Sequence, residues 1–219
     1  MADIHKVYRL FMARFRPRRM RAMARYFNIT PDTTVLDVGG ALYNWTLIDV
    51  RPRLTIVNLD DNHALDGVQF VKADARKLPF ADQSFDLVFS NSLLEHVGDF
   101  NDQLAAAREV RRVGRSYYVQ TPNYWFPIEP HHLAPFIHWL PRWMHRHLAR
   151  NFTLQGWINR PSQEQVAQMI GDIRLLTTRE MKKLFPDADF INERFCGLVK
   201  SLIVVNRPSR SGPTGSAPG

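Results

Sequence analysis

The sequence predicts one α/β domain built on a seven-stranded, mostly parallel sheet, with helices on both faces and a C-terminal antiparallel hairpin. Two observations support this prediction. Short apolar runs alternate with helical patterns between Thr34 and Gln120, which is typical of right-handed βαβ units. Two further strand-like runs near the C-terminus are separated only by Cys196-Gly197, which indicates a hairpin. A length of 219 residues suits one such domain with a sizeable core.

The elements follow in order from the pattern of apolar residues. The first strand, residues 35–38, is short and largely apolar and ends at two glycines, as expected for a buried parallel strand that enters a tight turn. Similar apolar runs predict four more strands, at residues 54–59, 68–71, 85–90 and 116–120. Helical patterns start at about residue 43 and cover residues 102–110, 163–170 and 178–184. The hairpin strands are predicted at residues 189–195 and 198–206.

The N-terminal segment, residues 1–30, is predicted to be helical and strongly basic. Four apolar side chains from Tyr8 to Phe15 recur at i, i+3, i+4 and i+7, which places them on one helix face. Pro17 is predicted to break or kink this helix, with a second helix over residues 18–27. The first 25 residues carry +7 of the net charge of +8, so the rest of the chain is nearly neutral. The segment either covers one side of the domain or acts as a lid or clamp for an anionic ligand.

The composition excludes several classes of protein. Cys196 is the only cysteine, which leaves no intramolecular disulfide and no cysteine-rich zinc site and fits a reducing compartment. No apolar run reaches the roughly 18 residues of a membrane span, and no signal-peptide pattern is present, so a cytoplasmic protein is expected. Nucleic acid is an unlikely partner, because the charge lies on one end and the body is nearly neutral. The sequence carries no signal for an oligomeric state.

Small or acidic residues follow the predicted parallel strands, and ligands bind at that edge of such sheets. Small residues from Asp37 to Gly40 let the backbone approach a ligand. Asp60 follows the second strand, 23 residues beyond Asp37, at the spacing of an acidic residue that binds a ribose diol. Asp74-Ala75 follows the third strand and Asn91 the fourth. This arrangement predicts a nucleotide-type ligand, and the absence of G-x-G-x-x-G disfavours a dinucleotide oxidoreductase.

Four stretches resemble the type-11 group of class I S-adenosylmethionine (SAM) methyltransferases, which have a Rossmann-like fold and include quinone C-methylating enzymes. These stretches are VLDVGG (35–40), IVNLD (56–60), VKADARKLPFADQSFDLVFSNSLLEHV (71–97) and KSLIVVNR (200–207). The LPF-x-D-x-SFDLV core is characteristic of the group. The resemblance implies a methyltransferase domain over residues 31–206, SAM as the cofactor and S-adenosylhomocysteine as its product.

The resemblance also implies a role for each strand-end residue. Asp37 and Gly39 would lie beside the methionine part of the cofactor. Asp60 would accept hydrogen bonds from both ribose hydroxyls. Asp74 and Ala75 would hold the adenine. The Asp74 carboxylate would bind the adenine amino group, and Ala75 would pack nearby. Asn91 would lie under the sulfonium end.

The glycine loop departs from the pattern of the group, which is D-x-G-x-G-x-G. Here the first motif glycine, Gly39, is present and Gly40 fills the next, variable slot, while Ala41 and Tyr43 replace the later glycines. One interpretation is weakened SAM binding. The other is a rebuilt loop that places a side chain from residues 43–45 on the cofactor, with Trp45 and Gly40 as predicted contacts.

Residues 122–156 break the alternation of strands and helices and are predicted to be an insertion that builds the acceptor pocket. The block YWFPIEPHHLAPFIHWLP (124–141) concentrates aromatic and histidine side chains, which suit sugar rings or flat phenolic rings. Histidine titrates near neutral pH and can remove the proton of a hydroxyl acceptor. The candidate catalytic residues are His132, His131, Glu129 and His96. The candidate substrate contacts are Tyr124, Trp125, Phe126 and His138. A divalent metal ion held by Glu129 and the histidines is an alternative.

The E-P-H-x-L-x-P-F-x-H-W-L-P pattern at residues 129–141 resembles small bacterial methyltransferases of glycan or polysaccharide synthesis. This resemblance implies a SAM-dependent methyltransferase that O-methylates a hydroxyl of a sugar or glycan precursor, with a histidine as the expected base. The first alternative is methylation of a quinone-like or lipid acceptor at a membrane surface, which the basic N-terminal helix would contact. The second is a non-catalytic, methyltransferase-like binding protein, motivated by the lost glycines. Methylation of nucleic-acid bases is disfavoured, because no N/D-P-P-Y/F turn follows the fourth strand and the lone cysteine lies in the hairpin. Residues 207–219 are rich in Pro, Gly and Ser and are predicted to form a disordered tail.

Overall fold

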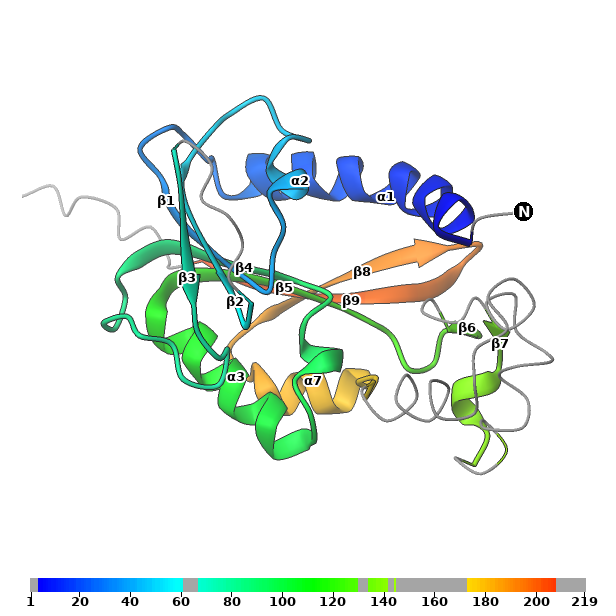
Figure 1. Ribbon diagram of the computed structural model, residues 1–219. Helices are drawn as coiled ribbons and strands as arrows, with labels where there is room; N and C mark the ends of the chain where they lie inside the picture. Colours follow the sequence, from blue (N-terminus) through cyan, green and yellow to red (C-terminus); the bar gives the residue numbers. More distant parts are fainter. Residues whose placement is uncertain (1–3, 61–66, 130–133, 142–143, 145–172, 208–219) are drawn as a thin grey trace, which may run out of the picture.

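The computed structural model describes residues 4–60, 67–129, 134–141, 144 and 173–207. Its centre is a seven-stranded sheet with the order β3-β2-β1-β4-β5-β9-β8 (Figure 1). The first five strands in this order are parallel, and β9 runs antiparallel to both of its neighbours, β5 and β8. The strands are β1 (Thr34–Val38), β2 (Arg53–Asn58), β3 (Val68–Lys72), β4 (Phe85–Asn91), β5 (Gly114–Pro122), β8 (Asp189–Phe195) and β9 (Leu198–Asn206). The predicted fold class is confirmed.

Helices cover both faces of this sheet (Figure 1). One face carries α1 (Ile4–Tyr26) and α2 (Leu42–Trp45), and the other carries α3 (Phe100–Val113) and α7 (Thr178–Leu184). Because the parallel strands alternate apolar side chains between the two faces, each helix layer has its own buried cluster. Short 3₁₀ helices, η1 (Leu94–His96) and η2 (Ile137–Trp139), and a small antiparallel pair, β6 (Ile128–Glu129) and β7 (Ala134–Pro135), complete the described elements.

The hairpin strands and α7 have the predicted bounds, and the parallel strands differ from the predicted ones by at most two residues at each end. The expected division of the N-terminal segment at Pro17 is wrong, because α1 is one helix through that residue. A proline in a helix interior costs about 3 kcal/mol. Met20 and Met23, each 1% exposed, pack the following turns onto the sheet, and burial of two such side chains offsets a cost of that size.

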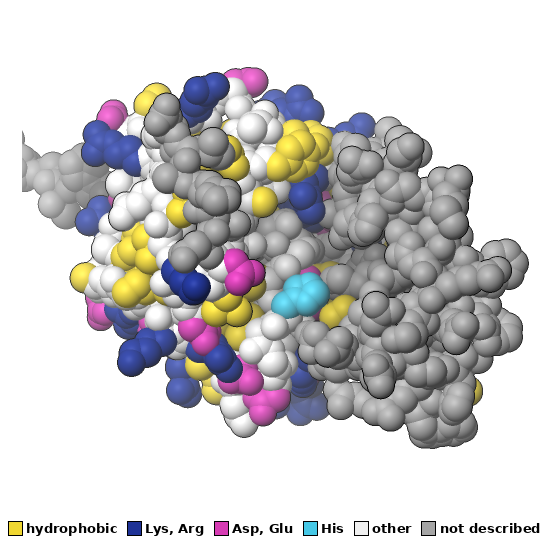
Figure 2. Space-filling model, viewed as in Figure 1, with side chains coloured by type: hydrophobic (Ala, Val, Ile, Leu, Met, Phe, Trp, Pro, Cys, Tyr) yellow, Lys and Arg dark blue, Asp and Glu magenta, His cyan; other side chains and the backbone are white. Residues whose placement is uncertain are grey.

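Some predictions concern residues outside the described part of the chain. These are the helix at residues 163–170, most of the insertion beyond Pro141, and the tail apart from Arg207. Among the described residues, no helix has both the length and the apolar composition needed to cross a membrane. On the face shown in Figure 2, acidic and basic side chains are interspersed, as the nearly neutral body of the sequence suggests.

Candidate cofactor site

A cavity of about 440 Å³ opens at the carboxyl ends of β1, β2 and β3 and beside η1. Five of the predicted site residues line it, namely Gly39, Asp60, Asp74, Ala75 and His96. A volume of this size is normal for a small-molecule site. The cavity therefore brings together residues that the sequence separates by almost sixty positions.

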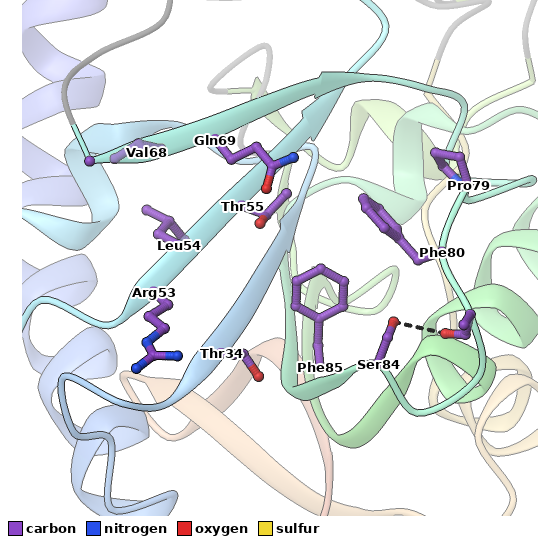
Figure 3. Close-up of a pocket in the computed structure, with 12 residues that line it drawn as sticks. Thr34, Arg53, Leu54, Thr55, Val68, Gln69, Pro79, Phe80, Ser84 and Phe85 are labelled. Atoms are coloured by element: carbon purple, nitrogen blue, oxygen red, sulfur yellow. Dashed lines mark hydrogen bonds between the residues drawn. The ribbon is translucent and has the colours of Figure 1, made fainter.

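A larger cavity of about 830 Å³ lies at the opposite, amino-terminal edge of the strands. Figure 3 shows Thr34, Thr55 and Gln69 on this side, together with the aromatic rings of Phe80 and Phe85. The predicted site residues in the described part of the chain do not line it. Because ligands bind at the carboxyl edge of parallel sheets, we assign the cofactor site to the smaller cavity.

Asp37 lies in β1 under the α1 face and is completely buried. Its Oδ2 accepts a hydrogen bond from Trp45 Nε1 at 2.8 Å, whereas Oδ1 has no partner among the described residues. Burial raises the pKa of Asp37 to about 7, although the Trp45 hydrogen bond and the positive charge of Arg16 oppose the rise. The carboxyl therefore lies behind the cavity wall and changes its charge near neutral pH.

Two glycines follow β1, and each position requires a glycine for a different structural reason. Gly39 has a φ of 72°, in the left-handed region, and a Cβ there would lie 2.5 Å from Leu93 Cδ1. At Gly40 a Cβ would lie 1.9 Å from the Asp37 carboxyl, and its carbonyl accepts a hydrogen bond from Asn58 Nδ2 at 3.0 Å. Gly39 makes the turn at the cavity, and Gly40 makes room for the buried carboxyl behind it.

The later motif positions need no glycine in this chain. Ala41 caps α2 with φ −135° and ψ 142°, an extended conformation that alanine adopts without strain. Tyr43 lies in α2 and is 55% exposed. Trp45, also in α2, is buried against Phe89 with ring centroids 5.4 Å apart. Within the described residues the loop is thus rebuilt around the Trp45–Asp37 hydrogen bond, and Trp45 lies behind the cavity rather than on its lining.

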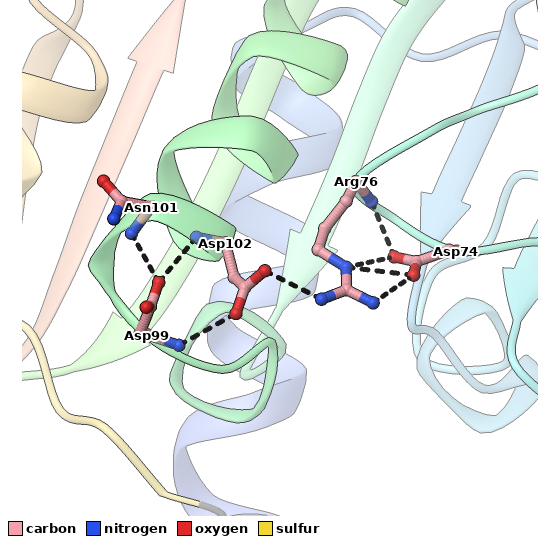
Figure 4. A network of polar contacts seen from close by, with 5 residues as sticks. All are labelled: Asp74, Arg76, Asp99, Asn101 and Asp102. Carbon is pink, nitrogen blue, oxygen red and sulfur yellow. Dashed lines mark hydrogen bonds and ion pairs between the residues drawn. The ribbon is translucent and has the colours of Figure 1, made fainter.

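Asp74 meets a cation that the sequence motifs did not single out, Arg76 (Figure 4). Its Oδ2 accepts hydrogen bonds from Arg76 Nε at 2.9 Å and Nη2 at 2.6 Å, and its Oδ1 accepts one from the Arg76 backbone N–H at 2.8 Å. These bonds hold the pKa of Asp74 below its usual value. Arg76 Nη1 also contacts Asp102 at 2.7 Å, whose side chain completes the capping box of α3 with Asp99. In the sequence, Arg76 directly follows the predicted adenine-binding pair Asp74-Ala75, and this position is the signal that could have identified it as a site residue.

The loop after Arg76 is fixed to α3 as well. Glu109 accepts a hydrogen bond from the Leu78 N–H at 2.7 Å. Arg112 donates to the carbonyls of Leu78 and Phe80 at 3.1 and 2.7 Å. The LPF part of the characteristic motif is therefore held in place by α3, with Leu78 itself buried in the core.

The end of β4 and the segment after it bring Asn91 and His96 to this edge of the sheet. Asn91, at the end of β4, is 9% exposed, and its Oδ1 has no partner among the described residues. His96, in η1, is exposed and lines the cavity. Its neighbour Glu95 is fully buried and accepts a hydrogen bond from Thr121 Oγ1 at 2.9 Å. His96 is therefore the candidate base that the described structure places at the cavity.

The described part of the insertion forms an aromatic cluster. The Tyr124 carbonyl meets Nε2 of His138 at 2.8 Å and accepts a hydrogen bond from Trp139 Nε1 at 2.9 Å. Trp125 is 63% exposed and Phe126 is buried. None of these side chains lines the 440 Å³ cavity.

The remaining candidates are only partly covered. Glu129 lies in β6, and His131 and His132 lie outside the described residues. Among the residues that the structure describes, no group of three His, Cys, Asp or Glu side chains could hold a metal ion.

The sheet order, the C-terminal antiparallel hairpin and a cavity with acidic residues after β2 and β3 define a class I methyltransferase fold. Residues 33–116 match the family described as a methyltransferase domain. The PH0226 protein from Pyrococcus horikoshii OT3 is similar in structure, with a TM-score of 0.56, 16% identity, and coverage of 92% of this chain and 91% of that chain. The YcgJ protein from Bacillus subtilis has a TM-score of 0.52 and 16% identity, with coverage of 80% and 70%. These likenesses show the fold.

Curated relatives extend the comparison. A demethylmenaquinone methyltransferase of Staphylococcus aureus (strain MRSA252) is 27% identical over 153 residues, which are 68% of this chain and 58% of that protein. The chain thus spans less than two thirds of that relative. A protein of the same name from strain JH9 is 25% identical over 194 residues, with coverage of 80% and 75%. The match over residues 33–116 and the likeness to these relatives support a class I SAM-dependent methyltransferase of the type-11 group, and SAM is the cofactor that this family implies.

Proposed function

We propose that the protein transfers the methyl group of SAM to a hydroxyl oxygen of a sugar-type acceptor. The observation that supports this most directly is the cavity at the carboxyl edge of the sheet, because it combines two carboxylates with an exposed histidine. Asp60 would bind the ribose hydroxyls, and Asp74 the adenine amino group. The left-handed turn at Gly39 gives a ligand close access to the backbone.

Bound SAM supplies an activated methyl group, and its transfer leaves S-adenosylhomocysteine. The protein mainly has to align the acceptor oxygen with that methyl group and accept the hydroxyl proton. His96 would take this proton as the oxygen lone pair forms the new O–C bond and the C–S bond breaks with its electron pair on sulfur. His131 and His132, with Glu129, are the other proposed candidates for this role.

Binding of the cofactor is tested first by calorimetry with SAM and with S-adenosylhomocysteine. Micromolar binding is expected, and absence of binding of either compound would support the non-catalytic alternative. Single alanine variants of His96, His131 and His132 then test the base. One of them should lose turnover at unchanged affinity for S-adenosylhomocysteine, and three fully active variants would contradict a histidine base.

A quinone-like acceptor is the second candidate, favoured by the similarity to the demethylmenaquinone methyltransferase of S. aureus. Exposed Trp125, Phe136 and Trp139 would suit an apolar, flat acceptor. Parallel assays with a panel of sugars and with a demethylated naphthoquinone distinguish the two candidates. Product analysis by NMR separates an O-methyl from a C-methyl group, and a C-methylated quinone would overturn the sugar proposal.

A further inference from the structure

Arg19 is a buried cation under α1. Its side chain is 3% exposed, although it belongs to the basic segment that the sequence suggests is solvated. Met20 and Met23 lie beside it on the helix and are each 1% exposed. Their burial holds this part of α1 on the sheet, so Arg19 is directed inward at the β8–β9 hairpin.

One edge of the Arg19 guanidinium already has a partner. Its Nη1 lies 3.3 Å from Glu193 Oε2 in β8. Lys200 Nζ in β9 binds the same oxygen at 3.0 Å. An irregularity in the β8–β9 register between Glu193 and Arg194 makes Lys200 the extra residue of β9, and such bulges redirect side chains. Glu193 Oε2 is thus shared between two cations.

The other edge of the same guanidinium has no partner within the described part of the chain. Nε and Nη2 of Arg19 are both buried and have no hydrogen-bond acceptor among the described residues. A buried charged donor without an acceptor is costly, and this pair of donors is the fork that binds a carboxylate side-on. Arg76 of the same chain shows how such a pair of donors binds a carboxylate, because its Nε and Nη2 both donate to Asp74.

The contacts around Arg19 show where its guanidinium lies relative to the candidate site. Ser201, next to Lys200, pairs with Pro122 at the carboxyl end of β5, where the insertion begins. Arg16, one turn before Arg19 on α1, acts electrostatically on Asp37. Arg19 therefore lies under α1 near the carboxyl end of β5, where the insertion begins.

We propose that the Nε and Nη2 edge of Arg19 binds a carboxylate of a ligand of this site. This proposal rests on the proposed function, because that function supplies the two ligands from which the carboxylate could come. One source is the carboxylate at the methionine end of SAM, and the other is a carboxylate on the acceptor. Both present the same planar group with two acceptor oxygens to the guanidinium fork.

The first experiment compares S-adenosylhomocysteine with 5′-methylthioadenosine, which lacks the amino-acid end. Calorimetry is done on the wild type, on Arg19→Gln and on Arg18→Gln, a control at an exposed arginine of the same helix. If the carboxylate is that of the cofactor, Arg19→Gln weakens S-adenosylhomocysteine at least tenfold and leaves methylthioadenosine within twofold. The control variant should bind both compounds like the wild type.

The second experiment titrates the wild type with a carboxylate other than SAM, and its result is interpreted together with the calorimetry of Arg19→Gln. The ¹⁵N Nε–H resonance of Arg19, assigned by its loss in Arg19→Lys, is followed in the wild type during titration with sodium benzoate and, separately, with benzamide. A shift with benzoate alone, at unchanged cofactor affinity of Arg19→Gln, supports a carboxylate on the acceptor. If benzoate causes no shift and Arg19→Gln binds S-adenosylhomocysteine like the wild type, the edge holds water only and the proposal is wrong. A wild type that binds neither nucleoside but shifts with benzoate would refute the proposed function and keep the carboxylate site.

Discussion

Replacing Asp37 by asparagine should remove a pH dependence that the buried carboxyl imposes on the stability of the fold. Burial raises the pKa of this group from 3.8 to about 7 in the folded protein. Between these values the folded protein keeps a proton that the unfolded chain has released. The stability contributed by the protonated carboxyl is therefore fully present below pH 3.8 and is lost as the pH rises through about 7.

The size of the effect follows from the shift. A difference of about 3 pKa units corresponds to roughly 4 kcal/mol over the whole titration. Of this, about 2–3 kcal/mol falls between pH 5 and pH 8. The asparagine side chain would not titrate, so the wild type should gain that amount over Asp37→Asn when the pH is lowered from 8 to 5. In a chain of this size this corresponds to about 5–10 °C in Tm.

The measurement is urea unfolding at pH 5, 6, 7 and 8 of the wild type, Asp37→Asn and the control Asp32→Asn. Asp32 is a matched carboxylate with an 88% exposed side chain, so its replacement should leave the pH profile parallel to that of the wild type. The quantity to compare is the change with pH of the difference in unfolding free energy between wild type and variant. A difference for Asp37→Asn that stays constant, or that grows with rising pH, would refute the burial argument.

Three further changes test the geometry of the site. Gly40→Ala should lower the free energy of unfolding by about 1–3 kcal/mol, measured by urea unfolding, because its Cβ would overlap the Asp37 carboxyl. Arg76→Gln should remove the hydrogen bonds that orient the Asp74 carboxylate and weaken SAM binding about tenfold in calorimetry, whereas unchanged binding would contradict an orienting role of Arg76. Arg112→Ala should destabilise the fold by about 1–2 kcal/mol at unchanged SAM affinity, since it fixes the loop and not the ligand.

The strands could be predicted because the signal for each one is local. Residues 189–195 and 198–206 alternate around a two-residue turn, and the structure gives the hairpin those bounds. Pro17 shows the limit of local rules, because the packing of Met20 and Met23 on the sheet is a tertiary term that no pattern within the helix contains.

The site residues at the ends of the strands could be predicted from the sequence, whereas the contacts behind the cavity were harder to predict. Asp60 and Asp74 line the cavity as their positions after β2 and β3 suggest. Asp37 occupies the expected position in the sequence, but its side chain lies on the α1 face behind the cavity. Its partner Trp45 was predicted as a cofactor contact, and the structure adds that the indole N–H donates a hydrogen bond to the Asp37 carboxyl.

The basic charge of α1 shows why a charge count alone cannot assign a role to a segment. Arg18 and Arg21 are exposed and act as solvated surface charges. Arg16 and Arg19, three residues apart and thus on one helix face, lie over the sheet, where the first lowers the pKa of Asp37 and the second binds Glu193. Because a charge acts more strongly in a buried environment than in water, these two inward arginines matter more for the site than the exposed ones. The packing of α1 and the protonation of Asp37 are therefore coupled. Replacing Arg16 by glutamine while α1 stays packed would remove this opposing charge, and the pKa of Asp37 would rise further.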